Sequence, residues 1–274
     1  MKKYLQLLVF ILNCSLAACQ AVRMPVAAQY LGLGAYSIKN TDAFSFTTNQ
    51  AALMQAKSLC VGLYGERRFL LAALNMYTAV IVVPTQKGNF GLQLDYFGSK
   101  NYNESQVGVA YAKHLGSRID MGVKFNYYRF TIPAYLSATS YNFEIGAIAH
   151  LSEKLHVGLH AYNPGGSKLI NTDNEKLGAA YKFGMGYDAS ETFSVAMEVI
   201  KEEDKPLDVN AGFRYNFLNQ FFIRAGVTTG AGIGYAGVGL SWKNFRLDVA
   251  GSYQLPLGFS PGLLLIADIN KKEN

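Results

Sequence analysis

The chain has 274 residues, of which 50% are apolar, 16% are charged and 27 are glycine. The charged fraction lies well below the roughly 25% of an average soluble protein. The net charge of +6 comes without a basic cluster interleaved with aromatic residues, so the composition argues against a nucleic-acid partner.

The first residues have the pattern of a secretory signal peptide. Lys2 and Lys3 form a positively charged region, an apolar run follows over 5–12, and small residues extend to Ala21. The apolar run is too short to span a bilayer as a helix. We therefore assign residues 1–21 to a signal peptide and expect the protein to be exported.

Two ways of processing this leader remain open. Residues 16–19 read Leu-Ala-Ala-Cys, which is similar to a bacterial lipobox whose Cys19 is acylated. Ordinary cleavage near Ala18 or Ala21 is the alternative, and a membrane-spanning protein needs no lipid anchor. In either case Cys60 is left without an obvious partner, so no disulfide framework is expected.

Residues 22–57 lack a regular period. Glycines, turn-forming residues over 42–48 and a possible short helix around 50–56 follow one another without alternation. We interpret this stretch as a plug or hatch segment.

From residue 58 onward the chain alternates between apolar and polar residues. In 207–217 the odd positions are apolar or aromatic and the even positions are polar or glycine, which is the pattern of a strand with two different faces. Similar runs predict roughly fourteen strands, an even number, as single-chain outer-membrane barrels have. The expected strands cover 58–64, 74–83, 90–96, 107–112, 119–127, 141–147, 155–160, 177–185, 193–199, 207–217, 221–227, 235–242, 245–249 and 262–269.

The fold class predicted from this pattern is all-β, a transmembrane antiparallel β-barrel over 58–270, with an N-terminal plug segment and a tail at 271–274. No later stretch is long and apolar enough for a transmembrane helix. The connections after even-numbered strands are short, and several after odd-numbered strands, such as 98–103, 130–140 and 163–175, are longer. This asymmetry is typical of outer-membrane barrels.

In a barrel of this kind the apolar face meets lipid and the polar face meets the lumen. Within 207–217 we therefore expect Phe213 to face lipid, and arginine placed at 211 or 213 to cost far more than at 210. Acidic and basic residues are balanced on the expected lumen face, which suggests internal ion pairs with a plug rather than a charge-selective pore. The lumen-facing polar candidates are Asp95, Asp120, Lys124, Glu144, His156, His160, Lys182, Glu198, Asp208, Arg214, Arg224, Arg246 and Asp248.

Motifs for catalysis or metal binding are weak. His156 and His160 share a strand face but lie roughly 13 Å apart along it, too far to hold one metal ion. His114 and His150 lie near turns, and we expect them to form no cluster with the other two. The glycines at 232, 234 and 237 match GxGxxG but enter a strand rather than a helix, and no GxSxG motif marks a nucleophile. We therefore predict no enzyme, no metal and no cofactor.

The segment from Ala28 to Leu53 resembles the opening of the FadL and PorV/PorQ outer-membrane barrels, a style of barrel found in Bacteroidota. In those families a glycine-containing stretch precedes an acidic residue, an NPA-like motif and the first strand. The matching positions are Gly32, Gly34, Asp42, Asn49 and Gln50, with Gln50 standing where those families usually have proline.

The resemblance implies a location in the outer membrane of a Gram-negative bacterium, in contact with its lipid. A FadL-like protein would bind or pass a small, hydrophobic molecule. A PorV/PorQ-like protein would instead be a non-transporting barrel that binds protein partners of type IX secretion. These two functions remain open from the sequence.

Overall fold

The computed structural model describes residues 32–172, 175–218, 220–230, 232–255 and 257–269. The predicted signal peptide (1–21), the lipobox, the first part of the predicted plug (22–31) and the tail (271–274) lie outside these ranges.

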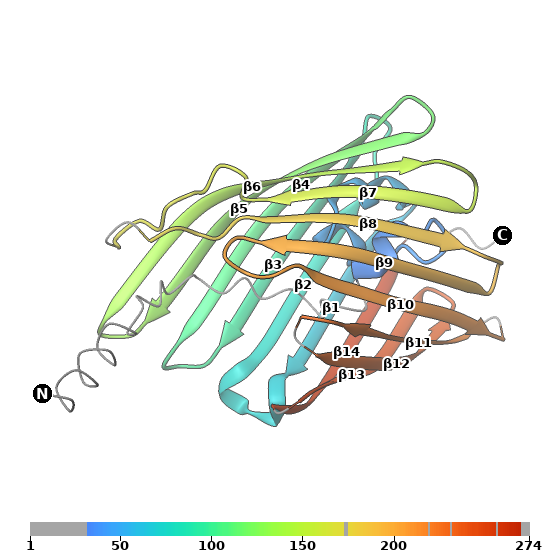
Figure 1. The fold of residues 1–274 in the computed structure, drawn as a ribbon. Coiled ribbons are helices and arrows are strands. Elements are labelled where there is room, and N and C mark those ends of the chain that lie inside the picture. Colours follow the sequence, from blue (N-terminus) through green and yellow to red (C-terminus); the bar gives the residue numbers. More distant parts are fainter. Residues whose placement is uncertain (1–31, 173–174, 219, 231, 256, 270–274) are drawn as a thin grey trace, which may run out of the picture.

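The described residues form one closed barrel of fourteen antiparallel strands (Figure 1). Each strand pairs with its neighbours in the chain, and β1 closes the barrel by pairing with β14 from Leu59↔Ile269 to Glu66↔Gly262. The strands are β1 Leu59–Arg67, β2 Asn75–Val83, β3 Asn89–Gly98, β4 Asn103–Leu115, β5 Ile119–Ile132, β6 Leu136–His150, β7 Leu155–Tyr162, β8 Ala180–Asp188, β9 Phe193–Glu202, β10 Asp208–Phe217, β11 Phe221–Thr228, β12 Ile233–Trp242, β13 Phe245–Gln254 and β14 Gly258–Ile269.

Among the described residues, helical structure is limited to short 3-10 turns. They are η1 Gly32–Tyr36, η2 Ser45–Thr47, η3 Gln50–Gln55, η4 Arg68–Leu70 and η5 Ala72–Leu74. The helix expected around 50–56 is therefore a 3-10 helix. No helix within the described ranges is long and apolar enough to cross a membrane.

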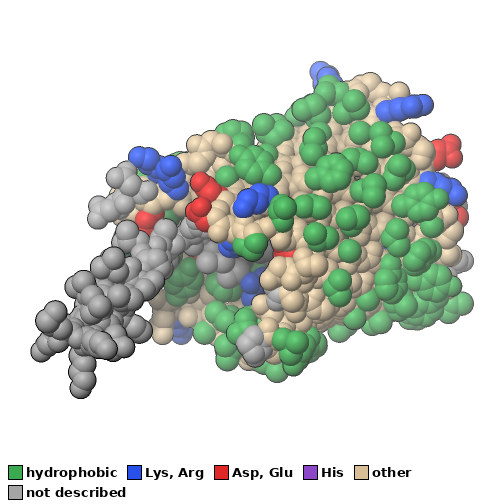
Figure 2. All heavy atoms as spheres, viewed as in Figure 1, with side chains coloured by type: hydrophobic (Ala, Val, Ile, Leu, Met, Phe, Trp, Pro, Cys, Tyr) green, Lys and Arg blue, Asp and Glu red, His purple; other side chains and the backbone are tan. Residues whose placement is uncertain are grey.

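The barrel is apolar outside and largely polar inside, as the alternation predicts. In β5, Val123 and Phe125 are exposed on the outer surface, whereas Lys124 and Asn126 between them are buried. Figure 2 shows hydrophobic side chains spread over the wall, with charged side chains mainly at its rims. Closing the sheet also satisfies every strand edge, so the transmembrane β-barrel predicted from the sequence is confirmed.

Large aromatic side chains lie on β3 and on β8 to β13 at the end of the barrel where the tight turns lie. Such belts mark the interface between membrane and water in outer-membrane barrels. The exposed residues of this belt are Phe90, Tyr187, Phe193, Phe217, Phe221, Trp242 and Phe245.

Three expectations about connections and strand bounds are wrong. Residues 130–140 are not a long loop, because β5 and β6 continue to a three-residue tip at 133–135. Residues 98–103 likewise reduce to a short turn between β3 and β4. The eighth strand begins at Ala180 rather than at Leu177, which is buried among Tyr162, Leu169 and other residues below the loop that follows β7.

The N-terminal residues 33–56 lie among the inward-facing side chains of the barrel. Most of them are buried, and η3 packs against β3, β4, β5 and β6 while η1 packs against β7, β8 and β9. Figure 1 shows this segment in blue within the ring of strands. Within the barrel, this segment therefore packs against the inward-facing side chains of the wall.

Candidate functional site in the barrel interior

One side of the interior is apolar. Apart from Thr78, the inward side chains of β2 are apolar here, as are Leu264 and Ile266 of β14. Phe44, Phe46 and Leu53 of the N-terminal segment pack against this wall. The inward wall residues of this apolar strip are Met76, Val80, Val82, Leu264 and Ile266. A wall that is apolar on both faces is unusual for a water-filled barrel, because lumen-facing residues of porins are polar.

The opposite side of the interior is polar and centres on the Glu144 carboxylate. Lys124 Nζ lies 2.8 Å from Glu144 Oε1, and His160 Nε2 lies 2.9 Å from Oε2. Gln50 of the N-terminal segment and Asn126 of β5 also donate to this carboxylate, at 2.6 and 2.8 Å. All these groups are buried, so the carboxylate has the charged and neutral donors that a buried anion needs.

The start and end of η3 are fixed by side-chain amides. Asn49 caps the helix by accepting a hydrogen bond from the Ala51 N–H, and its own amide donates to the Leu159 carbonyl of β7 at 3.1 Å. At the other end, the Asn89 amide of β3 donates to the Leu53 carbonyl at 2.7 Å. These bonds replace partners that a short helix leaves open at its ends.

Tyr36 of η1 lies over a run of glycines in the wall. A Cβ added at Gly184 would come within 2.1 Å of the Tyr36 ring, and one added at Gly158 within 2.6 Å, so only glycine permits this close approach. The Tyr36 hydroxyl donates to Glu198 Oε2 at 3.3 Å. Burial and the Glu198 carboxylate raise the pKa of Tyr36 well above its ordinary value, so the phenol stays a donor.

Histidines and carboxylates form a chain near the tight turns, contrary to the expectation that His114 and His150 stay apart. His114 and His150 both contact Asp120, the latter at 3.0 Å. The Nδ1 atoms of His150 and His156 lie 3.0 Å apart, and His156 Nε2 lies 3.4 Å from Asp188 Oδ2. Cross-strand pairing explains these contacts, since His114 lies opposite Asp120 and His150 lies opposite His156.

This histidine chain also holds the N-terminal segment. Gln55 donates to Asp120 Oδ2 at 3.0 Å, while the Ser37 hydroxyl and the Ile38 N–H donate to Asp188 at 2.6 and 3.2 Å. Both ends of the segment are thus bound to carboxylates at the same end of the barrel. Within the described residues, no group of three or more His, Cys, Asp or Glu side chains is arranged to hold a metal ion.

Three arginines surround the inward-facing ring of Phe222. The guanidinium carbons of Arg214, Arg246 and Arg224 lie 3.7, 4.7 and 5.8 Å from the ring centroid. Arg224 pairs with Asp248 at 2.8 Å. Arg246 pairs with Asp248 at 2.6 Å and with Asp42 of the N-terminal segment at 2.9 Å.

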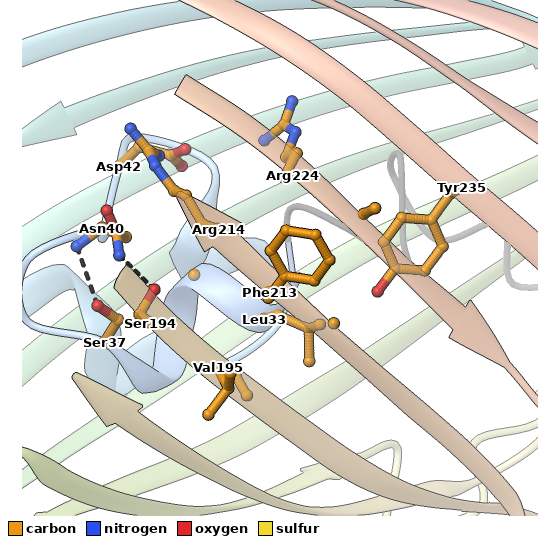
Figure 3. A pocket seen from close by; sticks show the side chains of 14 residues that line it. Leu33, Ser37, Asn40, Asp42, Ser194, Val195, Phe213, Arg214, Arg224 and Tyr235 are labelled. Atoms are coloured by element: carbon orange, nitrogen blue, oxygen red, sulfur yellow. Dashed lines mark hydrogen bonds between the residues drawn. The ribbon is translucent and has the colours of Figure 1, made fainter. Parts of the chain in front are cut away.

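A small cavity lies between this arginine group and the loop after η1 (Figure 3). Its volume is about 40 Å³. Arg214, Arg224 and Tyr235 line it from the wall, and Leu33 and Asn40 line it from the N-terminal segment.

The structure brings most of the lumen-facing candidates into three groups, centred on Glu144, Asp120 and Phe222. Lys182 and Glu198 lie 3.8 Å apart between the first and third of these groups. Asp95 accepts hydrogen bonds from Thr78 and Gln93, next to Lys124. Asp208 lies apart from all of them, where it accepts a hydrogen bond from Thr229 at the start of the turn after β11.

Sequence reasoning missed several contributors. Asp188 lies beyond the strand expected over 177–185, although extending the alternation of β8 from Lys182 places it on the inward face. Phe222 carries no polar signal, and Tyr36, Ser37 and Asn40 lie in a stretch without a period. Their contacts depend on how the N-terminal segment docks in the barrel, and no local sequence pattern predicts that docking.

Comparisons with known proteins agree with the fold. The chain is similar to the structure of a Pseudomonas aeruginosa FadL homologue, with a TM-score of 0.65, 12% identity, and coverage of 90% of this chain and 99% of that chain. It is similar to the Pseudomonas putida toluene transporter TodX, with a TM-score of 0.63, 10% identity, and coverage of 90% and 98%. It is also similar to the CymD monoaromatic hydrocarbon channel, with a TM-score of 0.62, 11% identity, and coverage of 85% and 94%.

No protein-family model matches the chain, and no curated protein matches it significantly in sequence. At these identities the likeness concerns the fold alone.

Proposed function

We propose that this chain is an outer-membrane protein that binds or passes a small hydrophobic molecule. The observation that carries the proposal is the apolar strip on one side of the interior, where Met76, Val80 and Leu264 meet Phe44 and other apolar side chains of the N-terminal segment. A hydrophobic molecule can move along such a surface with little desolvation of polar groups, because the hydroxyl of Thr78, the polar inward residue of β2 between Met76 and Val80, already donates to Asp95. The similar structures named for toluene and for monoaromatic hydrocarbons support this substrate class.

In this proposal the N-terminal segment acts as a plug. It contacts the apolar strip through Phe44, Phe46 and Leu53 and the polar side through Gln50. Passage along the strip requires those apolar contacts to separate, while the polar contacts keep the segment in the barrel. Export by the leader at 1–21 and residence in the outer membrane of a Gram-negative cell belong to the same proposal.

The secretion-accessory alternative has no observation in its favour within the described part of the chain. The polar residues of the interior are engaged with one another and with the N-terminal segment, and the similar structures described above are named as a transporter, a channel and a FadL homologue. We therefore do not propose it.

Uptake by intact cells tests the proposal. Gram-negative cells that express the chain are compared with cells that do not, using a radiolabelled monoaromatic hydrocarbon and, in parallel, a labelled sugar. We expect the chain to increase uptake of the hydrocarbon several-fold and to leave uptake of the sugar unchanged. Equal hydrocarbon uptake by both cell types, once heat-modifiable barrel has been detected in the outer membrane of the expressing cells, would contradict it.

A matched pair of variants locates the route. Met76 is buried in the apolar strip, and glutamine has nearly the same length but adds a polar amide. We expect Met76→Gln to lower hydrocarbon uptake and Met76→Leu to retain it. Equal uptake by the two variants would place the route elsewhere.

A further inference from the structure

The cavity beside Phe222 is lined by two arginines that are neighbours on the inner face of adjacent strands. Arg214 of β10 and Arg224 of β11 are direct cross-strand partners, and both side chains line the cavity. Like charges placed directly opposite on one face of a sheet repel each other. The pair therefore needs a compensating negative charge nearby.

The carboxylates of this region do not fully supply that charge. The group has three arginines but two carboxylates, Asp42 and Asp248, and both carboxylates pair with Arg224 or Arg246. No described carboxylate lies within 4.0 Å of the Arg214 guanidinium, whose Nε donates to the neutral Asn216 amide oxygen at 3.0 Å. Stacking on Phe222 at 3.7 Å stabilises Arg214 only in part, because an aromatic face carries no net charge.

The remaining sequence offers no obvious carboxylate either. Residues 1–31 contain no Asp and no Glu, so they have no acidic side chain that could pair with Arg214. Outside the described ranges, the acidic residues are Asp173 and Glu273. Asp173 follows a segment that pairs with β6 through Ile170, and β6 neighbours neither β10 nor β11. Glu273 follows the end of β14.

The cavity also offers a neutral donor. Ser194 lines it and is the cross-strand neighbour of Arg214 on the other side. Its oxygen accepts a hydrogen bond from the Asn40 amide at 2.6 Å, which leaves its own O–H free to donate (Figure 3). Asp42, which also lines the cavity, is already engaged, with Oδ2 on Arg246 and Oδ1 on the Phe44 N–H.

The volume limits what can enter. The cavity holds about 40 Å³. One water needs about 10–15 Å³ on this measure, so the space suits an ion of a few atoms and excludes a sugar acid or a lipid. Guanidinium groups and a hydroxyl are donors that bind halides and small carboxylates.

We propose that this cavity binds a small monovalent anion, of the size of chloride or formate, between Arg214 and Arg224 with Ser194 as a third donor. The site is separate from the apolar strip, so this proposal does not depend on the transported molecule. The anion neutralises the excess charge of the arginine group next to the loop that carries Asn40 and Asp42. It therefore stabilises the docked N-terminal segment.

Bromide is the probe that tests the site. The purified full chain in detergent is titrated with sodium bromide at constant ionic strength, with sodium gluconate as the replacement salt because gluconate is too large for the cavity. We expect a saturable rise of the unfolding temperature in the unsubstituted protein and in the control Arg129→Gln, which removes an exposed arginine of β5. Arg214→Gln should weaken the apparent affinity at least ten-fold. An identical response of Arg214→Gln, or no saturation in the unsubstituted protein, would overturn the proposal.

Two further measurements keep the test decisive if Arg214→Gln does not fold. Crystals grown in bromide should show an anomalous peak between the Arg214 and Arg224 guanidiniums, and its absence contradicts the site. Ser194→Ala keeps both arginines, and we expect it to weaken bromide binding by several-fold. Titrations with chloride and with formate then show which anion saturates the site at the lower concentration.

Discussion

Gln50 Nε2 lies 2.6 Å from Glu144 Oε2, in a buried contact between the N-terminal segment and β6. Gln50 stands at the position where the FadL and PorV/PorQ barrels usually have proline. Proline has no side-chain donor, so it could not form this bond. Where this sequence departs from the motif that it resembles, Gln50 therefore has a specific partner in the wall.

Replacing Gln50 by leucine should destabilise the docked segment. Glu144 would keep Lys124, His160 and Asn126 as partners but lose one donor, which costs about 1–3 kcal/mol for a buried charged acceptor. The free energy of unfolding is measured by urea titration in lipid vesicles. Gln86→Leu, in the exposed turn after β2, is the matched control and should change it little. Equal values for the two variants would show that the bond contributes nothing.

The glycine run under Tyr36 gives a second prediction. Gly184→Ala places a methyl group within 2.1 Å of the Tyr36 ring, and overpacking of this kind costs about 1–3 kcal/mol. Tyr36→Leu removes the ring, so the double variant should lose less stability than the sum of the two single variants. A double-mutant cycle on the unfolding free energy measures this coupling.

Gly234→Ala is the control for this cycle, because nothing lies within 4 Å of a Cβ added there. It should leave both the stability and the coupling unchanged. Strict additivity of Gly184→Ala and Tyr36→Leu would mean that the ring does not occupy this place in the membrane.

The wall of the barrel was predictable because its pattern is local. Alternation with a period of two assigns each side chain to one face, and the tight turn at 151–154 brings His150 opposite His156. The same reasoning, centred on residue 219, brings Arg214 opposite Arg224. Folding each expected hairpin about its turn predicts these pairs, and the expectation that His150 lies apart from His156 is wrong because the two residues are placed symmetrically about that turn.

The docking of the N-terminal segment was not predictable in this way. Gln50 and Glu144 are 94 residues apart, and Asp42 and Arg246 are 204 residues apart. No period connects them, because the segment is irregular and its partners are set by the shape of the closed barrel. The lengths of β5 and β6 were also not predictable from the sequence, since these strands continue through residues of 130–140 that were expected to form a loop.

Asp188 should stabilise the docked residues 33–40 of the N-terminal segment more strongly than the exposed Glu191 does. Asp188→Asn removes a buried charge that accepts from Ser37 and the Ile38 N–H and faces His156 at 3.4 Å. We expect faster hydrogen exchange of the amides over 33–40. The control is Glu191→Gln, whose exposed ion pair with Lys39 is worth at most about 1 kcal/mol, so exchange should change little. Similar exchange rates in both variants would contradict the prediction that Asp188 holds residues 33–40 in place.

The orientation of β10 is tested by a charge at Phe213. This residue is 40% exposed on the outer face, in the middle of the strand, so arginine there should cost about 2–4 kcal/mol at the membrane midplane. Phe213→Leu keeps the surface apolar and should cost much less. Unfolding from lipid vesicles measures both variants.

The alternation predicted that arginine would destabilise the protein little at Asn210, which faces inward on the same strand. The structure does not support this prediction. Asn210 is 1% exposed and bonded to Glu198 and Tyr235, so a longer side chain there must displace packed groups. The comparison that decides the orientation is therefore arginine against leucine at position 213. If the two variants unfold with the same free energy, Phe213 does not face lipid, and the assignment of the two faces of β10 is wrong.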